Sequence, residues 1–225
     1  MVIVFFVAKS SGSITPLGLD IPRGCGRFRS DIMILPIVQY NDPRLREKGR
    51  PVESFDAELK ALFADMVETM HDAEGIGLAA QQIGKPIRFC VVDVRHAQDT
   101  FNFKLDGRAN LPADLIMPLA VANPGITFPS PETSVCEEGC LSIDDIRGDV
   151  ERPERIHVTF QDLEGRPHTL ECDGIFARCL LHEADHLDGI LFLDRMQKKD
   201  LKALEKKLKI LKRRTRDALG AARGR

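Results

Sequence analysis

The stretch Arg178-Cys-Leu-Leu-His-Glu-Ala-Asp-His-Leu-Asp-Gly189 decides how this chain folds. It places His182 and His186 four residues apart, with Glu183 directly after the first histidine. Side chains at this spacing lie on the same face of a helix, so both imidazoles can bind one metal ion. A carboxylate in the position of Glu183 can reach a water molecule beside that metal. The stretch therefore predicts a helix that carries a metal-dependent catalytic site.

The helix expected from Gly174 to Leu187 is apolar on nearly every side, which is typical of a buried helix. Asp173 can cap its start, and Gly189 can end it. Because an unpaired ionisable side chain is costly to bury, the two histidines must be hydrogen-bonded or bound to a metal. A pair of hydrogen-bonded core histidines is the alternative, but Glu183 between them favours the metal.

A catalytic site of this kind needs a third protein ligand. Cys140 is the best candidate, because it follows an expected strand in a glycine-containing bend that can direct its side chain inward. One cysteine and two histidines form a known catalytic zinc coordination, and a thiolate also suits Fe(II). Asp185 would point to the side of the helix, where we expect it to orient a ligand.

Two other arrangements stay open. Glu205 lies 19 residues after His186 and would complete a His-His-Glu zinc endopeptidase site, although the lysines around it favour an ion pair. Cys136 and Cys140 could instead join the two histidines in a closed structural zinc site. A closed site has no use for Glu183, and with a basic C-terminus it would indicate a nucleic-acid-binding module.

The composition fits one globular domain with tails, because 43% of the 225 residues are apolar and 29% are charged. No apolar run approaches the ~20 residues of a membrane-spanning helix, so no membrane partner is expected. A chain of this length can form a core without disulfides, so its six cysteines indicate free thiols in a reducing, cytoplasmic location.

The chain divides into three parts. Residues 1–32 show no periodicity and form an uncertain N-terminal extension, which is either disordered or not native if translation begins at Met33. Residues 33–196 form the catalytic domain. Residues 197–225 form a basic amphipathic helix and tail, whose apolar side is Leu201, Leu204, Leu208 and Leu211.

Charge is concentrated at the C-terminal end. From residue 195 onward there are 13 Lys and Arg against 3 Asp and Glu, a net charge of +10, while the whole chain carries −2. The basic helix either docks on its own domain with its charges solvated or binds an anionic partner, and the two interpretations are compatible.

Local patterns predict the other elements. An amphipathic helix is expected to start at Ser54 or Asp56 and to end near Glu74. Residues 95–113 are polar and loop-like. Alternating apolar residues predict an antiparallel hairpin formed by residues 156–160 and 168–172. Further strands are expected over residues 34–38, 88–94, 115–121 and 132–138.

Three segments in this order and spacing resemble the three motifs of the peptide deformylase family: Gly75-Ile-Gly-Leu-Ala-Ala-Gln-Gln82, Glu137-Glu-Gly-Cys-Leu-Ser142 and His182-Glu-Ala-Asp-His186. The resemblance runs from about Met33 to Met196. It implies an α+β fold in which antiparallel sheets pack around a central metal-binding helix, with a C-terminal helix outside.

The resemblance also implies an activity, namely removal of the formyl group from the N-terminal formylmethionine of nascent polypeptides, with release of formate. It implies Cys140, His182 and His186 as ligands of Fe(II), with Zn(II) or Ni(II) as alternatives. Nascent formylated peptides would be the substrates. The basic C-terminal helix would bind the ribosome, and a monomer is expected.

The groups implied around the formyl carbon are Gln82, the backbone amide of Leu141, and Glu183, and the motif spacing selects Gln82 over Gln81. Glu183 can take a proton from water and pass it to the leaving amine. Hydrogen-bond donors at the developing oxyanion are typically worth ~3 kcal/mol each. The residues expected to contact substrate are Gly77 and Gly139 through their backbone, Arg147, and the apolar pocket residues Ile76, Ile175 and Cys179.

Overall fold

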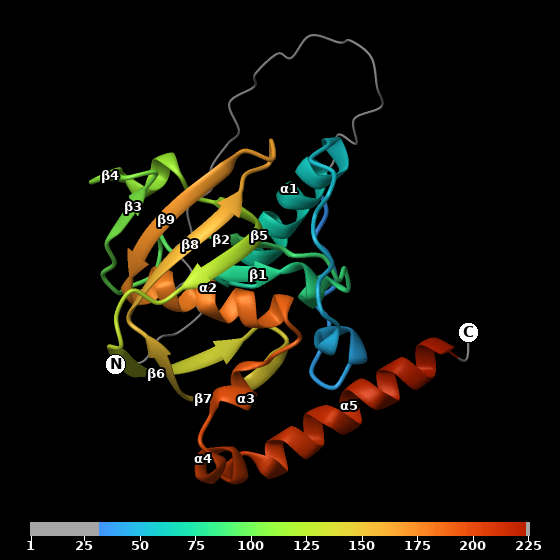
Figure 1. Ribbon diagram of the computed structural model, residues 1–225. Helices are drawn as coiled ribbons and strands as arrows, with labels where there is room; N and C mark the ends of the chain where they lie inside the picture. The colour runs from blue at the N-terminus through green and yellow to red at the C-terminus, as the bar shows by residue number, and fades with distance from the viewer. Residues whose placement is uncertain (1–31, 224–225) are drawn as a thin grey trace.

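The computed structural model describes residues 32–223, in which one helix lies between two antiparallel sheets (Figure 1). That helix is α2 (Gly174–Leu187), with the bounds that the sequence predicts. The α+β fold expected for the chain is therefore confirmed. Apart from Ile32, the predicted N-terminal extension lies outside the described residues.

The larger sheet has seven strands, and every neighbouring pair is antiparallel. In spatial order they are β1 (Gly77–Ala79), β2 (Phe89–Val92), β5 (Leu119–Thr127), β8 (Arg155–Gln161), β9 (Pro167–Asp173), β3 (Phe103–Leu105) and β4 (Arg108–Ala109). The predicted hairpin is β8–β9, in which Ile156 pairs with Cys172 and Val158 with Leu170. These four side chains are buried against α2, because alternate residues of a strand share one face.

Helix α1 (Ala57–Asp72) covers the opposite face of the β1–β2–β5 part of the sheet. The Asp56 carboxylate caps its start by accepting hydrogen bonds from the Glu58 and Leu59 amides at 2.9 and 3.1 Å. Met66 and Met70 are fully buried in the core beneath it. Both the amphipathic helix and its cap are confirmed.

The second sheet pairs β6 (Thr133–Cys140) with β7 (Ile143–Pro153) on the other side of α2. Its apolar residues form a separate core with α3 (Phe192–Arg195) and with α5 (Glu205–Arg223), which follows the short helix α4 (Lys198–Ala203). Leu208 of α5 is buried there, and three neighbouring leucines are half-buried: Leu201, Leu204 and Leu211. The basic helix therefore docks its apolar side on its own domain.

Some predicted boundaries were wrong. Residues 34–38 are not a strand, because the Leu35 amide donates to Thr69 Oγ1 of α1 and the Val38 amide to the Gln82 carbonyl. Residues 95–113 contain the short strands β3 and β4. Strand β7 was not predicted.

The strand expected over residues 115–121 starts later and ends later, because β5 runs from Leu119 to Thr127 and continues through Asn123 as a bulge. Asn123 has a φ of 51°. Its side chain bonds the Val52 amide and carbonyl at 2.8 and 2.9 Å. These bonds hold the irregular backbone in place. The described residues also contain three short 3-10 helices, Pro43–Arg46, Ala80–Ile83 and Ala113–Leu115. Across the described residues, no helix has both the length and the apolar character needed to cross a membrane.

Candidate metal centre

The three predicted ligands meet between α2 and the end of β6. The ligand atoms of Cys140, His182 and His186 all lie within 4.8 Å of one another, and Cys140 Sγ is 3.2 Å from His186 Nε2. The two histidines are one turn apart on α2. A bulge between Gly139 and Cys140 ends the β6 ladder where the cysteine side chain turns toward α2. A thiolate and two imidazoles fit a divalent metal such as zinc or iron.

Neither alternative ligand set is assembled. Glu205 lies on α5 with a side chain that is 57% exposed, and it pairs with Lys209 at 2.6 Å. The cluster of potential ligands found in residues 32–223 does not include Cys136, which packs against the apolar core between α2 and the large sheet. The endopeptidase and the structural-zinc interpretations therefore find no support in the described residues.

Glu138 orients the first histidine ligand. Its Oε2 atom lies 3.0 Å from His182 Nδ1, which holds the proton there and leaves Nε2 for the cluster. We expected Asp185 to have this role, but its carboxylate contacts Arg152 and Arg195 instead. The available signal for Glu138 was its position two residues before Cys140 in the second motif.

Two buried arginines hold Glu138 in place. Arg152 donates from Nε and a terminal nitrogen to the two carboxylate oxygens at 2.7 and 2.9 Å, and Arg178 donates to Oε1 at 2.9 Å. Burial raises the pKa of Glu138, but hydrogen bonds from Arg152 and His182 outweigh it and hold that pKa well below its usual range. Glu138 is therefore an anion at neutral pH.

Glu183 is the buried carboxylate beside the cluster. Its side chain is 1% exposed, and in the part of the chain that the structure describes its Oε2 has no hydrogen-bond partner. Burial raises the pKa of Glu183 to about 7. A buried carboxylate next to three potential metal ligands, with its pKa close to neutral pH, is suited to transferring a proton at a metal site.

The electrostatics of the cluster favour a positive charge. Burial lowers the pKa of His182, yet hydrogen bonds with Cys140 and Glu138 raise it to about 10. Burial and the neighbouring His182 lower the pKa of His186 well below its usual value, so the two rings are not both imidazolium cations. Without a metal, a proton on His182 supplies this positive charge. A divalent cation bound by the three side chains would supply it instead.

Gln82 points at the cluster, as the motif spacing predicts. The Ala79 amide donates to Gln82 Oε1 at 2.8 Å, so the amide nitrogen faces Cys140 Sγ at 3.4 Å and Ser142 Oγ at 3.3 Å. Gln81 instead donates to the Leu187 carbonyl. Leu141 directly follows Cys140 in the turn between β6 and β7.

The residues predicted to contact substrate differ in how close they lie to the metal-ligand cluster. Gly139 and Arg147 pair in the β6–β7 ladder, next to Cys140. Ile175 lines a cleft of about 380 Å³ at the start of α2. Ile76 and Cys179 lie in the core, where the Cys179 thiol donates to the Ile76 carbonyl at 3.3 Å. Gly77 lies on β1 against Glu183.

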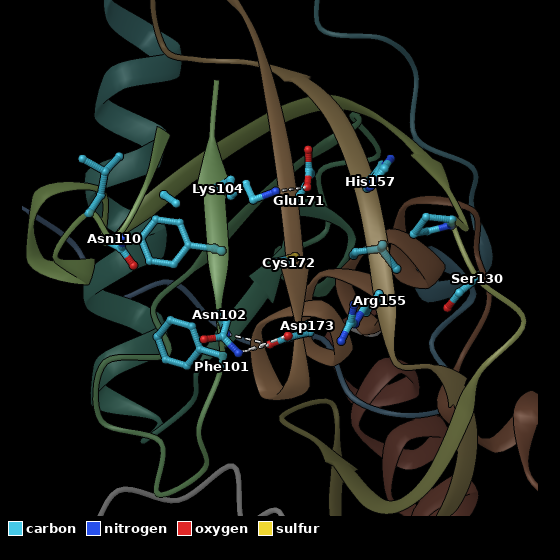
Figure 2. A pocket seen from close by; sticks show the side chains of 15 residues that line it. Phe101, Asn102, Lys104, Asn110, Ser130, Arg155, His157, Glu171, Cys172 and Asp173 are labelled. Atoms are coloured by element: carbon cyan, nitrogen blue, oxygen red, sulfur yellow. Dashed lines mark hydrogen bonds and ion pairs between the residues drawn. The ribbon is translucent and has the colours of Figure 1, made fainter. Parts of the chain in front are cut away.

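A separate depression of about 740 Å³ lies over β3, β9 and β8 (Figure 2). Its polar side chains, among them Lys104, His157 and Glu171, lie on the sheet face opposite α2, because Phe103, Ile156 and Cys172 alternate with them and face the core. Lys104 pairs with Glu171 across it. None of the three potential metal ligands lines this depression.

A buried carboxylate and two histidines on a central helix, with a cysteine from the neighbouring strand, are typical of a metal-dependent hydrolase. Residues 34–202 match the sequence model of the polypeptide deformylase family. A peptide deformylase of Opitutus terrae is 55% identical over 188 residues, which is 83% of this chain and 97% of that protein. One of Bartonella quintana is 43% identical over 73% of this chain and 85% of its own length.

Solved structures agree. A peptide deformylase of Synechococcus elongatus, in complex with actinonin, has a TM-score of 0.65 and 39% identity, and the match covers 77% of this chain and 87% of that one. A deformylase of Arabidopsis thaliana has a TM-score of 0.71 and 30% identity over 83% and 94% of the two chains. The chain belongs to the peptide deformylase family. It is a metal-dependent hydrolase that removes the formyl group from formylmethionine at the start of nascent polypeptides and releases formate.

Proposed function

We propose that deformylation depends on Glu183 as general base and acid beside a divalent ion held by Cys140, His182 and His186. The observation that carries this proposal is the buried Glu183 carboxylate, with one oxygen lacking a protein partner among the described residues, next to that ligand set. We propose Fe(II) as the metal, with Zn(II) or Ni(II) as alternatives, and a thiolate with two imidazoles suits each of these ions. The ion supplies Lewis acidity, which lowers the pKa of a water molecule towards ~7.

Glu183 carries the proton. Because burial raises its pKa to about 7, the carboxylate can accept a proton from the attacking water and hand it to the departing amine at neutral pH. The proton ends on the new N-terminus of the peptide, and the oxygen of the water ends in formate. The buried position of Glu183 keeps bulk water from exchanging with that proton.

Gln82 and the Leu141 backbone amide stabilise the oxyanion that forms on the formyl oxygen. The fixed orientation of the Gln82 side chain supports this role, because its nitrogen already faces the cluster before substrate binds. A donor that is positioned in advance loses no free energy in turning toward the transition state.

The substrate backbone lies against Gly77 and Gly139, with Arg147 beside it on β7. Its methionine side chain packs against the apolar residues Ile76, Ile175 and Cys179, which belong to the same core cluster beside α2. The position of Gly139 and Arg147 at the cluster end of the β6–β7 ladder supports this path.

Residues 33–196 form the catalytic domain, and residues 197–225 form a basic segment that attaches a cytoplasmic, monomeric enzyme to the ribosome. The apolar side of α5 packs on the domain, so charged residues such as Lys206, Lys207 and Arg213 are exposed. Reversing these three charges should reduce co-sedimentation with ribosomes, most at low salt, without changing deformylation of a short peptide. Unchanged co-sedimentation would contradict ribosome attachment.

Metal content and formate release together test the site. Cys140→Ala should lose metal and activity, whereas Cys136→Ala, a cysteine four residues away on the same strand, should keep both. Glu205→Ala should also keep both. If Cys140→Ala retains its metal, or if Glu205→Ala loses it, the ligand set is wrong.

A further inference from the structure

We infer that Asp185 and Arg195 are positioning residues for the metal ligand His182, acting through a line of ion pairs that ends at Glu138. The inference rests on the proposed metal site. Neither residue belongs to the cluster, and Arg195 lies at the end of α3, outside the three sequence motifs.

The contacts form one unbroken line. His182 Nδ1 meets Glu138 Oε2 at 3.0 Å. Arg152 donates to both oxygens of Glu138 and, from its remaining terminal nitrogen, to Asp185 Oδ2 at 2.7 Å. Arg195 then donates to Asp185 Oδ1 at 2.7 Å and to Oδ2 at 3.2 Å.

Burial makes these contacts interdependent. The side chains of Glu138 and Arg152 are 0% and 4% exposed, and that of Asp185 is 10% exposed, whereas that of Arg195 is 47% exposed. Buried charges interact more strongly than charges in water, and they have no solvent to replace a lost partner. Arg195 is thus the solvent-accessible end of a network that is otherwise dry.

Arg152 is shared between two carboxylates, which gives Arg195 its influence. While Arg195 holds both oxygens of Asp185, Arg152 is free to grip Glu138 with two parallel hydrogen bonds. Without Arg195, the hydrogen bond from Arg152 is the one described side-chain contact that the Asp185 carboxylate keeps. Asp185 then draws that guanidinium away from Glu138, and the orientation of His182 loosens.

The measurement is the rate at which the zinc-loaded enzyme releases its metal to a chelator. Partners in the second layer of a metal site typically change affinity ~10–100-fold, and we expect Arg195→Gln to release zinc ~10-fold faster, at the low end of that range. Arg195→Lys should recover part of the loss, because it restores the positive charge but not the pair of hydrogen bonds to Asp185. Arg46→Gln is the matched control, because Arg46 pairs with Asp194, the neighbour of Arg195, at similar exposure.

The melting temperature of the metal-free proteins separates positioning from general destabilisation. If Arg195 had a purely structural role, Arg195→Gln and Arg46→Gln would lower the melting temperature and accelerate zinc release to the same extent. Zinc release at the wild-type rate in Arg195→Gln, or equal acceleration in both variants, overturns the inference. If Arg195→Gln does not fold, the isosteric Asp185→Asn decides by the same criterion. A wild-type enzyme that binds no zinc would instead contradict the proposed metal site.

Discussion

Glu183 Oε1 occupies the space that a side chain on Gly77 would need. An ideal Cβ at Gly77 would lie 2.4 Å from this oxygen and 2.7 Å from Cys179 Sγ. The sequence suggested that Gly77 lets the substrate backbone approach. The structure adds another reason for glycine, because the carboxylate that handles the proton packs directly against this position on β1.

Gly77→Ala should therefore impair catalysis without removing the metal. The added methyl group must displace Glu183, and a displacement of about 1 Å at a catalytic group can cost ~100-fold in rate. We expect kcat/KM for a formyl-Met peptide to fall by about that factor, with metal content unchanged. Gly220→Ala on α5, where nothing lies within 4 Å of the new Cβ, is the control. Equal activity of the two variants would show that Glu183 is not constrained by β1.

Gln82→Ala should lower kcat by ~100–1000-fold, the usual cost of one oxyanion donor, with a smaller effect on KM. Gln81→Ala removes a neighbouring buried amide that bonds the Leu187 carbonyl, so it should reduce stability and leave kcat nearly intact. Steady-state kinetics on both variants compare them directly. A normal kcat for Gln82→Ala would exclude Gln82 from the reaction.

The docking of α5 predicts a contrast between two of its residues. Leu208 is 8% exposed in the core with β7 and α3, whereas Ile210 is 48% exposed. Leu208→Ala should lower the free energy of unfolding by ~2–3 kcal/mol, and Ile210→Ala should change it by less than ~0.5 kcal/mol. Urea denaturation monitored by circular dichroism measures both. Similar values would mean that α5 does not pack on the domain in solution.

His168 should make stability depend on pH. Its two ring nitrogens contact Asp106 at 2.8 Å and Asp162 at 3.2 Å. Partial burial lowers the pKa of His168, but these hydrogen bonds outweigh it and raise the pKa above its usual value. The folded state thus binds the proton more tightly, so the stabilisation is complete below the unfolded pKa of about 6.5 and is lost as the pH rises through the folded pKa.

His168→Gln should consequently cost ~0.5–1 kcal/mol at about pH 5.5, and less at about pH 9. Unfolding free energies of wild type and variant at the two pH values give the difference. A cost that grows with pH would contradict the ion pairs.

The elements that the sequence predicts well are those whose pattern of apolar residues lies within one short segment. Helix α2 is apolar on nearly every side, and the β8–β9 hairpin alternates around a single turn. Strand β7 was missed because its buried side chains, Ile143, Ile146, Val150 and Arg152, do not recur with a period of two. The apolar residues face α3 and α5, whereas Arg152 reaches Glu138 beside α2.

The support around the metal ligands could not be predicted for a similar reason. Glu138 bonds arginines that are 14 and 40 residues away in the chain. Apart from its position two residues before Cys140, nothing local distinguishes Glu138 from Glu137. Only the pairing of β6 with β7 directs one carboxylate into the core and leaves the other outside it.

The central claim is that Glu183 moves the proton while Cys140, His182 and His186 hold the metal. Glu183→Gln keeps the size of the side chain and removes its basicity. Metal content and formate release from a formyl-Met peptide should be measured on the same preparation. We predict a full complement of metal and a loss of ~100–10,000-fold in formate release. Wild-type formate release by the metal-loaded variant would contradict the account.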